Sequence, residues 1–503
     1  MSARRPVRTV AAVDLGAESG RVVQVDFDGE HLDSREISRF THTPVPVDGI
    51  LRWDLDHLTG AITDGLGTLG GDGIPVASVG VDAWGVDYGL LGADGVLVDL
   101  PTCYRDPRQL PAMDEALATV GPERLYRSTG VQLNEINTVY ALMSDARTTT
   151  RLDDATALLM MPDVFHHLLC GSRVTEFTAA STTGLYDIAG GRWVTELADE
   201  LGIPTRVLPE VVSPGTDLGA VVGPLGDGPL AGTRVIAPAG HDTASAVVAT
   251  PFPEPGALFI SSGTWSLVGV EVPRPVVTPE SRAANLTNEG GYAGTTRLLR
   301  NVMGLWILQE CRRTWAGQGV DLSYAELTEL AGREPALRSF VNPNARDFLG
   351  RGDMPARVQA YCHRSGQPVP EGPAAIARCV VDSLALSYRT TAEDIAAITG
   401  TAPPAVCVTG GGARNGLLAQ ATADATGLPV ICGPVEATSL GNAATQLVAL
   451  GELGGIADIR ALVARTTDLR TWSPRPDQRW EQAAARLREM TQDDDRQRGL
   501  IPT

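Results

Sequence analysis

Two short stretches of the chain show the same pattern of apolar runs around small polar residues. Residues 9–27 (TVAAVDLGAESGRVVQVDF) place apolar runs on both sides of GAESG, and residues 257–272 (ALFISSGTWSLVGVEV) do so around SSGTWS. Short apolar runs separated by Gly and Ser predict two strands joined by a tight turn. Aligning Gly16 with Gly263, an offset of 247 residues, also aligns a serine three residues further on. Two similar hairpins, one opening each half, predict a duplicated domain.

Other segments alternate apolar runs with turn residues. We expect a strand, an irregular turn and a second strand over residues 76–92, and a strand, a Gly triplet and a helix over residues 405–427. Residues 428–451 repeat the order strand, loop, helix. Apolar spacing of three and four residues predicts further helices. They fall at 134–148, 297–315 and 374–398.

Pro-rich segments mark the expected joints between domains. They occupy residues 204–214 and 251–255. We therefore expect an N-terminal domain over residues 1–245, a C-terminal domain over residues 246–470 and a charged helical tail over residues 471–503.

Length and composition fit an enzyme with more than one domain. The chain has 503 residues, 43 % of them hydrophobic, and 55 glycines, which is typical of an α/β protein with two or three domains. No apolar run approaches the roughly 20 residues of a membrane span, and the opening MSARRPVRTV contains no apolar signal core. Seven cysteines without CxxC spacing indicate reduced thiols. We expect a cytoplasmic protein.

The charged residues narrow the function further. A net charge of −19 argues against a nucleic-acid or anionic-membrane surface. Every basic residue apart from histidine is arginine, because the sequence contains no lysine. This excludes a Walker P-loop, the β3 lysine of protein kinases and a pyridoxal Schiff base. Nucleotide phosphates would therefore be held by backbone N–H groups, arginine and a metal ion.

Three glycine-containing turns are candidates for phosphate binding. Asp14 comes just before Gly16, so backbone N–H groups could take phosphate oxygens while the carboxylate orients hydrated Mg²⁺. The alternative is an ordinary hairpin in which Asp14 accepts turn hydrogen bonds. Residues 261–264 repeat the arrangement with hydroxyl groups, and the triplet 410–412 joins a predicted strand to a helix. A flexible turn would also explain that triplet.

The motif DAWGVDY, residues 82–88, brings Asp82, Trp84, Gly85 and Asp87 to one turn. Carboxylates beside an indole are typical of a sugar site, because the acids accept hydroxyl hydrogen bonds and the ring covers C–H groups. A buried tryptophan with polar turn residues is the alternative.

The segment GHDTAS contains His241 and Asp242. Metal binding is disfavoured because no second His or Cys stands at ligand spacing. Asp242 is expected as the N-cap of a helix over residues 243–250, where the helix dipole favours its anion. An ionised aspartate in that position could also accept the proton of a hydroxyl during phosphoryl transfer.

Taken together, these segments resemble the FGGY carbohydrate-kinase family. The resemblance runs nearly end to end, through VAAVDLGAESGRV, GVDAWGVDYGLL, HDTASAV, SSGTWSLVG, NLTNEGG, TGGGARN and GPVEATSLGNAATQL. It implies an α/β fold of two ribonuclease-H-like (actin/hexokinase-like) domains with a ligand cleft between them. The activity it implies is MgATP-dependent phosphorylation of L-rhamnulose on its terminal hydroxyl, giving L-rhamnulose 1-phosphate.

The resemblance also implies roles for individual residues, with Asp242 as the catalytic base and Asp14 serving Mg²⁺ through water. ATP and its phosphates would be bound by Asp14, Ala17, Glu18, Ser19, Gly20, Arg21, Thr264, Gln309 and Gly411. The sugar would contact Gly85, His241, Asp242, Thr243 and Asn301. Glu18 departs from the family pattern, in which a small hydroxyl residue can stand at this place.

Two other functions remain open on the sequence. The substrate could be another ketose such as L-fuculose or L-ribulose, because specificity rests on the orientation of a few hydroxyls. A protein of another class, a nucleotide-switched assembly protein related to actin or Hsp70, would share the paired domains and phosphate hairpins. We expect sugar and ATP as partners, no nucleic acid or membrane, and a monomer or homodimer.

Overall fold

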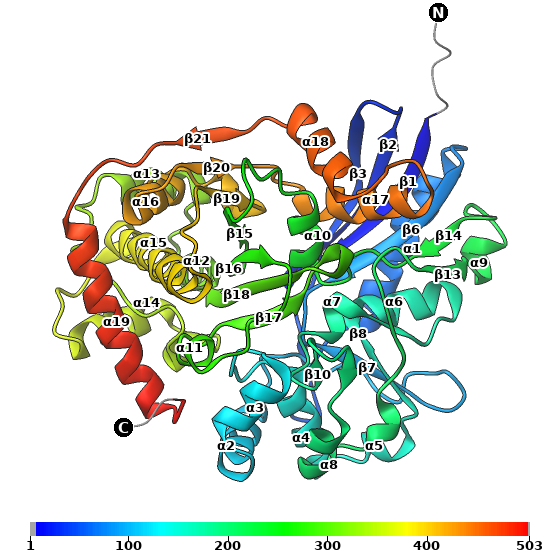
Figure 1. Ribbon diagram of the computed structural model, residues 1–503, viewed down its shortest axis with the longest axis horizontal. Coiled ribbons are helices and arrows are strands. Elements are labelled where there is room, and N and C mark those ends of the chain that lie inside the picture. The colour runs from blue at the N-terminus through cyan, green and yellow to red at the C-terminus, as the bar shows by residue number, and fades with distance from the viewer. Residues whose placement is uncertain (1–6, 501–503) are drawn as a thin grey trace, which may run out of the picture.

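A computed structural model describes residues 7–500, and it contains two large mixed sheets (Figure 1). The first six residues lie outside this range. They belong to the opening MSARRPVRTV, which contains no apolar signal core. The first sheet has the order β13-β14-β6-β1-β2-β3. Its strands are β1 (Arg8–Leu15), β2 (Ser19–Phe27), β3 (Leu32–Thr41), β6 (Val76–Ala83), β13 (Asp217–Ala220) and β14 (Arg234–Ile236).

The second sheet has the order β17-β18-β16-β15-β19-β20-β21. Its strands are β15 (Leu258–Ser262), β16 (Trp265–Val272), β17 (Thr287–Gly290), β18 (Thr296–Met303), β19 (Val406–Thr409), β20 (Val430–Cys432) and β21 (Arg470–Trp472). Short strands pair separately as β4 (Val45–Val47) with β5 (Ile50–Arg52), β7 (Tyr88–Leu91) with β8 (Ala157–Met160), β9 (Thr175–Glu176) with β12 (Val211–Val212), and β10 (Tyr186–Asp187) with β11 (Arg192–Trp193).

Helices cover both sheets and fill the space around them. In the first half they are α1 (Leu55–Gly71), α2 (Gln109–Thr119), α3 (Pro122–Thr129), α4 (Thr138–Thr148), α5 (Arg151–Asp154), α6 (Met161–Cys170), α7 (Phe177–Ala180), α8 (Thr195–Glu200), α9 (Gly223–Gly226) and α10 (Asp242–Val248). In the second half they are α11 (Pro279–Ala283), α12 (Trp306–Gly317), α13 (Tyr324–Gly332), α14 (Met354–Arg364), α15 (Gly372–Thr399), α16 (Gly416–Thr426), α17 (Ala437–Ala449), α18 (Ile456–Thr466) and α19 (Arg479–Gln497).

The two sheets repeat one topology, which confirms the predicted duplication. In each, an antiparallel hairpin (β1–β2 or β15–β16) gains a third antiparallel strand, β3 or β18. On the other side follow two parallel strands and an antiparallel edge, β6-β14-β13 or β19-β20-β21. The turns differ by one residue, because the last pair is Leu15 with Gly20 in one hairpin and Ser262 with Ser266 in the other.

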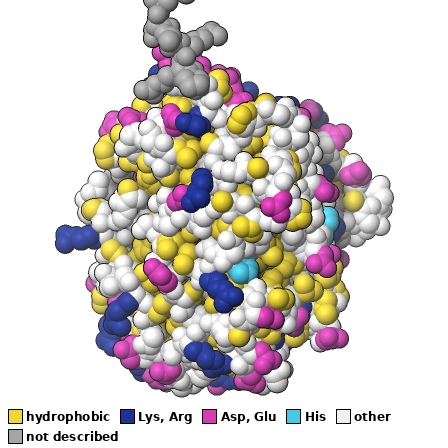
Figure 2. Space-filling view, turned by 90° about the vertical axis from the view of Figure 1, so that its right-hand side faces the viewer, with side chains coloured by type: hydrophobic (Ala, Val, Ile, Leu, Met, Phe, Trp, Pro, Cys, Tyr) yellow, Lys and Arg dark blue, Asp and Glu magenta, His cyan; other side chains and the backbone are white. Residues whose placement is uncertain are grey.

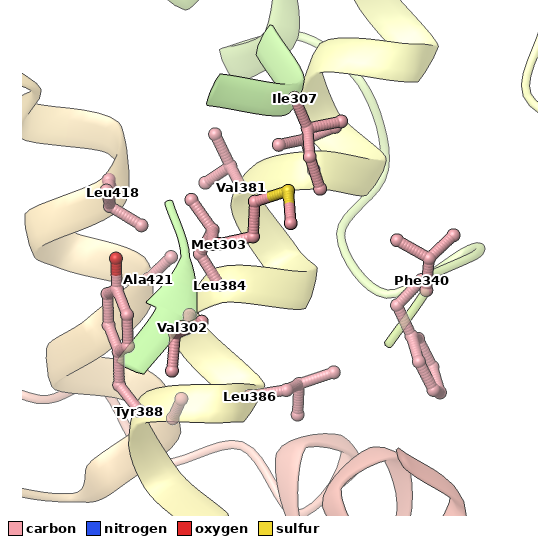
Figure 3. Packing of buried hydrophobic residues seen from close by; sticks show 14 of the residues in the cluster. Val302, Met303, Ile307, Phe340, Val381, Leu384, Leu386, Tyr388, Leu418 and Ala421 are labelled. Carbon is pink, nitrogen blue, oxygen red and sulfur yellow. The ribbon is translucent and has the colours of Figure 1, made fainter. Parts of the chain in front are cut away.

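The large core of the second half lies around α15, whose 28 residues follow the predicted helix at 374–398 closely (Figure 3). Val381, Leu384 and Tyr388 of α15 are buried in one cluster with Met303. Helix α19 adds Trp480, Leu487 and Met490 to the same cluster. The predicted helix in the tail is therefore present, and one of its faces belongs to this core.

Helix α17 lies beside β1 in the first sheet although it comes more than 400 residues later (Figure 1). Its Asn442 and Gln446 donate hydrogen bonds to Asp82 at 2.6 Å and to the carbonyl of Ala11 at 2.9 Å. Gly441 lets the helix approach α10 closely, because a Cβ at this position would overlap the carbonyl oxygen of Ser245. α17 therefore holds α10 against the end of the first sheet.

Two predicted helices begin later than the sequence pattern indicated. The helix expected at 134–148 begins at Thr138, and residues 131–137 form a loop. The helix expected at 297–315 was wrong in its first half, because residues 296–303 form β18 and α12 begins only at Trp306. β18 pairs with strands on both sides, so its apolar residues are buried by the sheet rather than by one helix face.

The surface carries mixed charge. On the face drawn in Figure 2, acidic and arginine side chains are scattered between apolar and neutral atoms. Among residues 7–500, no helix is both long and apolar enough to cross a membrane. The boundaries at residues 245 and 470 stay predictions.

Replacing Gly441 with Ala is expected to destabilise the protein. The added methyl group would push α17 away from α10, and overpacking of this kind costs about 1–3 kcal/mol. The matched control is Gly60→Ala in α1, where an added Cβ meets no atom within 4 Å; removing a glycine there should leave stability unchanged or raise it. Thermal unfolding followed by circular dichroism compares the two. Equal unfolding temperatures for both variants would contradict the close contact.

Candidate active site

The two hairpin turns, the Gly triplet and the start of α10 line one cleft with a volume of about 370 Å³. The cleft therefore brings together segments that are up to 400 residues apart. Nearly all the residues predicted to bind ligands face it. They are Asp14, Ala17, Glu18, Ser19, Arg21, Gly85, His241, Asp242, Thr243, Thr264, Asn301, Gln309 and Gly411.

Gly20 is the exception among the predicted residues. It lies in β2, and a Cβ added to it would come within 2.5 Å of Phe40 and 2.7 Å of Leu15. Gly20 is therefore needed for packing behind the first turn, and it is not part of the cleft wall.

Asp14 lies at the end of β1, where two donors hold its carboxylate. Arg21 donates to Oδ2 through Nε at 2.9 Å, and the hydroxyl of Ser439 donates at 2.8 Å. Arg21 also contacts Glu436, which comes just before α17. A single fixed carboxylate matches the way Mg²⁺ is usually held, with water and phosphates as its other ligands. No cluster of three or more His, Cys, Asp or Glu side chains suited to a metal occurs within residues 7–500.

The turns offer a cradle that fits nucleotide phosphates. In the described chain, the backbone amides of Ala17, Glu18 and Thr264 have no acceptor. Gly410 and Gly412 lie against the second hairpin, because a Cβ on either residue would press into Ser262. Free amides beside closely packed glycines are the arrangement in which backbone binds phosphate oxygens.

Asp242 stands at the first turn of α10, but it is not the N-cap. The N-cap position belongs to His241, and the Asp242 carboxylate accepts a hydrogen bond from the amide of Thr243. Burial raises the pKa of Asp242; His241 opposes this shift, and the negative charge of Asp14 adds to it. The amide of Thr243 at the start of the helix does lower this pKa, but burial outweighs it. The side chain is still 29 % exposed and open to the cleft.

The backbone at His241 is held in place by hydrogen bonds to the buried carboxylate of Glu176 and to its neighbour Thr178. Glu176 accepts hydrogen bonds from the amides of Thr178 and Gly240 at 2.8 and 2.9 Å, and the Thr178 hydroxyl accepts one from the amide of His241 at 3.0 Å. Burial raises the pKa of Glu176 to about 7. This network fixes the backbone where the chain enters α10, and it thereby positions the side chains of both His241 and Asp242.

The carboxylates of the DAWGVDY motif do not face the cleft. Asp82 is completely buried and accepts a hydrogen bond from Asn442. Asp87 accepts hydrogen bonds from the indoles of Trp53 and Trp84 at 2.6 and 2.9 Å. The interpretation of these two acids as hydroxyl acceptors was wrong, whereas Trp84 and Gly85 do line the cleft.

The sequence reasoning missed several residues of the cleft wall. Glu289 lies in the NLTNEGG segment, whose single residues had no assigned role, and Tyr104 lies outside the segments named above. Glu436 and Arg414 flank the nucleotide side. Arg414 follows the Gly triplet by two residues, so the triplet was a signal for it, whereas the other three residues are revealed only by the fold.

Comparison with known proteins gives a family match for each half of the chain. The model of the FGGY family of carbohydrate kinases, N-terminal domain, matches residues 9–249, and that of the C-terminal domain matches residues 258–450. A rhamnulokinase from Bacteroides thetaiotaomicron is 40 % identical over 475 residues, covering 94 % of this chain and 97 % of the relative. A rhamnulokinase from Pectobacterium carotovorum is 42 % identical, covering 93 % and 94 %.

Solved structures agree on the fold. Xylulose kinase from Rhodospirillum rubrum superposes with a TM-score of 0.76 at 18 % identity, covering 98 % of this chain and 100 % of the other. Plasmodium falciparum glycerol kinase with ADP gives a TM-score of 0.76 at 16 % identity, covering 97 % and 98 %. The two-domain fold predicted from the sequence is confirmed.

The chain belongs to the FGGY family of carbohydrate kinases. It is an ATP-dependent sugar kinase, and the enzymes of this family use ATP with Mg²⁺.

Replacing Glu176 with Gln is expected to change how stability depends on pH. The pKa of Glu176 rises from an ordinary 4.5 to about 7 on folding, so between these values the folded state binds the proton more tightly. This contribution to the free energy of unfolding is complete below pH 4.5 and is lost as the pH rises through 7.

Thermal unfolding of both proteins at pH 5 and pH 8 tests this expectation. The wild type should lose more stability than the variant between the two values, by on the order of 2–3 kcal/mol. Other groups titrate in both proteins and cancel in the comparison. Parallel losses would show that Glu176 is ionised across the whole range.

Proposed function

We propose that this chain phosphorylates L-rhamnulose on its terminal hydroxyl, taking the phosphoryl group from MgATP and giving L-rhamnulose 1-phosphate. The observation that carries the proposal is that Asp242 and both phosphate-type hairpins line one cleft. The substrate itself is supported by relatives named rhamnulokinase that share 40–42 % of their residues across more than nine-tenths of the chain.

The nucleotide side of the cleft is formed by residues from both halves. The amides of Ala17, Glu18 and Thr264 would hold phosphate oxygens, and Arg21 would add the positive charge that lysine supplies elsewhere. Asp14 would orient Mg²⁺ through water. The bound metal supplies charge neutralisation to the phosphates. Gln309 and Gly411 complete this side of the cleft.

Asp242 is the proposed base. A primary hydroxyl is far less acidic than an aspartic acid of pKa about 4, so the carboxylate cannot deprotonate it in advance. It instead orients the attacking oxygen and takes the proton late in a loose transition state. The raised pKa of Asp242 makes it a better acceptor of that proton. Closure of the cleft would exclude water, which competes for the phosphoryl group.

The sugar side is proposed to include Gly85, His241, Thr243 and Asn301. Gly85 leaves room beside the imidazole, because a Cβ on it would come within 3.2 Å of Nε2 of His241. A small residue there lets a ring or chain of hydroxyl-bearing carbons approach both His241 and Asp242. The reaction is proposed to take place in the cytoplasm, which fits the seven cysteines, all free thiols in the described chain. A monomer or homodimer is proposed as the working form.

Asp242→Asn is expected to abolish turnover while leaving nucleotide binding nearly intact. Loss of a general base lowers kcat by roughly 10²–10⁴-fold, and the affinity for MgATP should stay within a few-fold because this side chain faces the sugar. Steady-state kinetics with a coupled ADP assay and calorimetry with MgATP measure the two effects. Asp56→Asn in α1, at an exposed position, is the control. An Asp242→Asn variant with undiminished kcat would disprove the role.

The proposed preference for L-rhamnulose can be tested with a panel of ketoses. L-Rhamnulose should give the highest kcat/KM, ahead of L-fuculose and L-ribulose, and ADP release without any sugar should be slow. The measurement is the same coupled assay, with the phosphorylated product identified by mass spectrometry. A higher kcat/KM for another ketose, or ADP release that does not depend on sugar, would refute the assignment to L-rhamnulose.

A further inference from the structure

One carboxylate in the wall of the cleft, that of Glu289, has no role assigned to it so far. Glu289 belongs to β17 of the second half, lines the cleft and has a side chain that is only 5 % exposed. It stands near His241 and Asn301, two of the proposed sugar contacts. A buried carboxylate needs a positively charged partner and hydrogen-bond donors to offset the loss of its hydration.

Arg297 is the charge partner. It lies directly opposite Glu289 in the antiparallel pair of β17 and β18, with Nη1 at 3.2 Å from Oε2 of the acid. Arg297 is completely buried and donates to the carbonyl of Gly290 through Nε at 2.8 Å. Burial alone would raise the pKa of Glu289, but Arg297, followed by His241 and Asn301, lowers it below the ordinary value. The carboxylate is therefore an anion.

In the part of the chain that the structure describes, the inner oxygen of Glu289, Oε2, lacks an aligned donor. Oε2 lies 3.2 Å from Nδ1 of His241 and 3.2 Å from Nη1 of Arg297, yet neither approach has hydrogen-bond geometry. Within residues 7–500, Oε2 of Glu289 therefore has no hydrogen-bond partner, although His241 and Asn301 lie close enough to stabilise the anion. A buried charged acceptor without donors is costly, and ligand hydroxyls would supply the missing donors.

Two other buried acids of the chain accept hydrogen bonds from internal donors on one of their two oxygens. Asp145 accepts a hydrogen bond from Arg151 at 2.6 Å and another from the hydroxyl of Tyr88 at 2.8 Å, and it lies outside the cleft. Glu176 accepts hydrogen bonds from backbone amides. Each has internal donors on one carboxylate oxygen, Oδ2 of Asp145 and Oε2 of Glu176, and neither faces the cleft, so their roles are structural. Glu289 differs because its free acceptor capacity lies at the sugar side of the cleft.

We propose that Glu289 is a specificity-determining residue, whose carboxylate accepts hydrogen bonds from hydroxyl groups of the ketose while Arg297 holds it in place. The inference rests on the proposed function, because it assumes a polyhydroxylated substrate beside His241. The ligand class it selects is a sugar that presents hydroxyl donors toward β17. A ketose with one of these hydroxyls inverted would leave the carboxylate unsatisfied and bind more weakly.

The test compares wild type, Glu289→Gln and Asp145→Asn in steady-state assays with MgATP. Glu289→Gln keeps the shape of the side chain and removes its charge. The KM for L-rhamnulose should rise about tenfold or more, since a hydrogen bond to a charged group is lost, while kcat falls less and the KM for MgATP stays within about twofold. The preference for L-rhamnulose over L-fuculose, its C4 epimer, should shrink.

Asp145→Asn is the matched control, because it also removes the charge of a buried acid paired with arginine. It should lower the unfolding temperature and leave the KM for the ketose unchanged. If Glu289→Gln does not fold, the double variant Glu289→Gln/Arg297→Gln, which removes both buried charges, takes its place with the same expected rise in KM. A folded variant with wild-type KM and wild-type sugar preference overturns the proposal.

The outcome for Glu289 can be separated from the outcome for the substrate. If the wild type prefers another ketose, the assignment to L-rhamnulose fails, and the same variants are then assayed with that ketose. A KM effect on the preferred ketose supports Glu289 whichever sugar it is. An unchanged KM for the preferred ketose refutes Glu289 while the kinase activity stands.

Discussion

Three acidic side chains lie together at the end of the first sheet, and the arrangement of the cleft depends on how their charges are accommodated there. Asp14 and Asp82 lie opposite each other on the parallel strands β1 and β6, and Asp242 stands close enough to affect both. Burial, followed by Asp14 and Asp242, raises the pKa of Asp82 well above its ordinary value. Asn442 donates to it from α17. Asp82 is thus enclosed behind the cleft, while Asp14 and Asp242 both face it.

The lack of lysine shapes the nucleotide side of that cleft. Arg21 reaches both Asp14 and Glu436, so a single guanidinium joins the first hairpin to the start of α17. A planar, permanently charged group can contact two carboxylates at once, which a compact ammonium does less well. In the proposed function the backbone amides of the two turns bind the phosphates together with Arg21, and the position of the second turn depends on glycine packing around Ser262.

The sequence predicts those parts of the fold and site that rest on local patterns. The hairpins, the Gly triplet and α15 follow from apolar runs and turn residues, and nearly every ligand residue implied by the family resemblance does line the cleft. The strand β18 was predicted as part of a helix, because a strand buried on both sides lacks the alternation of apolar and polar residues that marks an exposed strand. Asp82 was misread because the donor that covers it, Asn442, lies 360 residues away. Glu289 was missed because its role depends on a cross-strand partner and on a cleft formed by both halves.

Residues from the last quarter of the chain complete both cores, which has a consequence for biosynthesis. One face of the first sheet, with Val10 and Val25, packs against residues 437–463, and the core of the second half includes Trp480 and Leu487 of α19. During translation, neither half can bury its apolar surface until these late segments leave the ribosome. The emerging chain therefore exposes an uncovered sheet for most of its synthesis, and this period is when chaperones would have to protect it from aggregation.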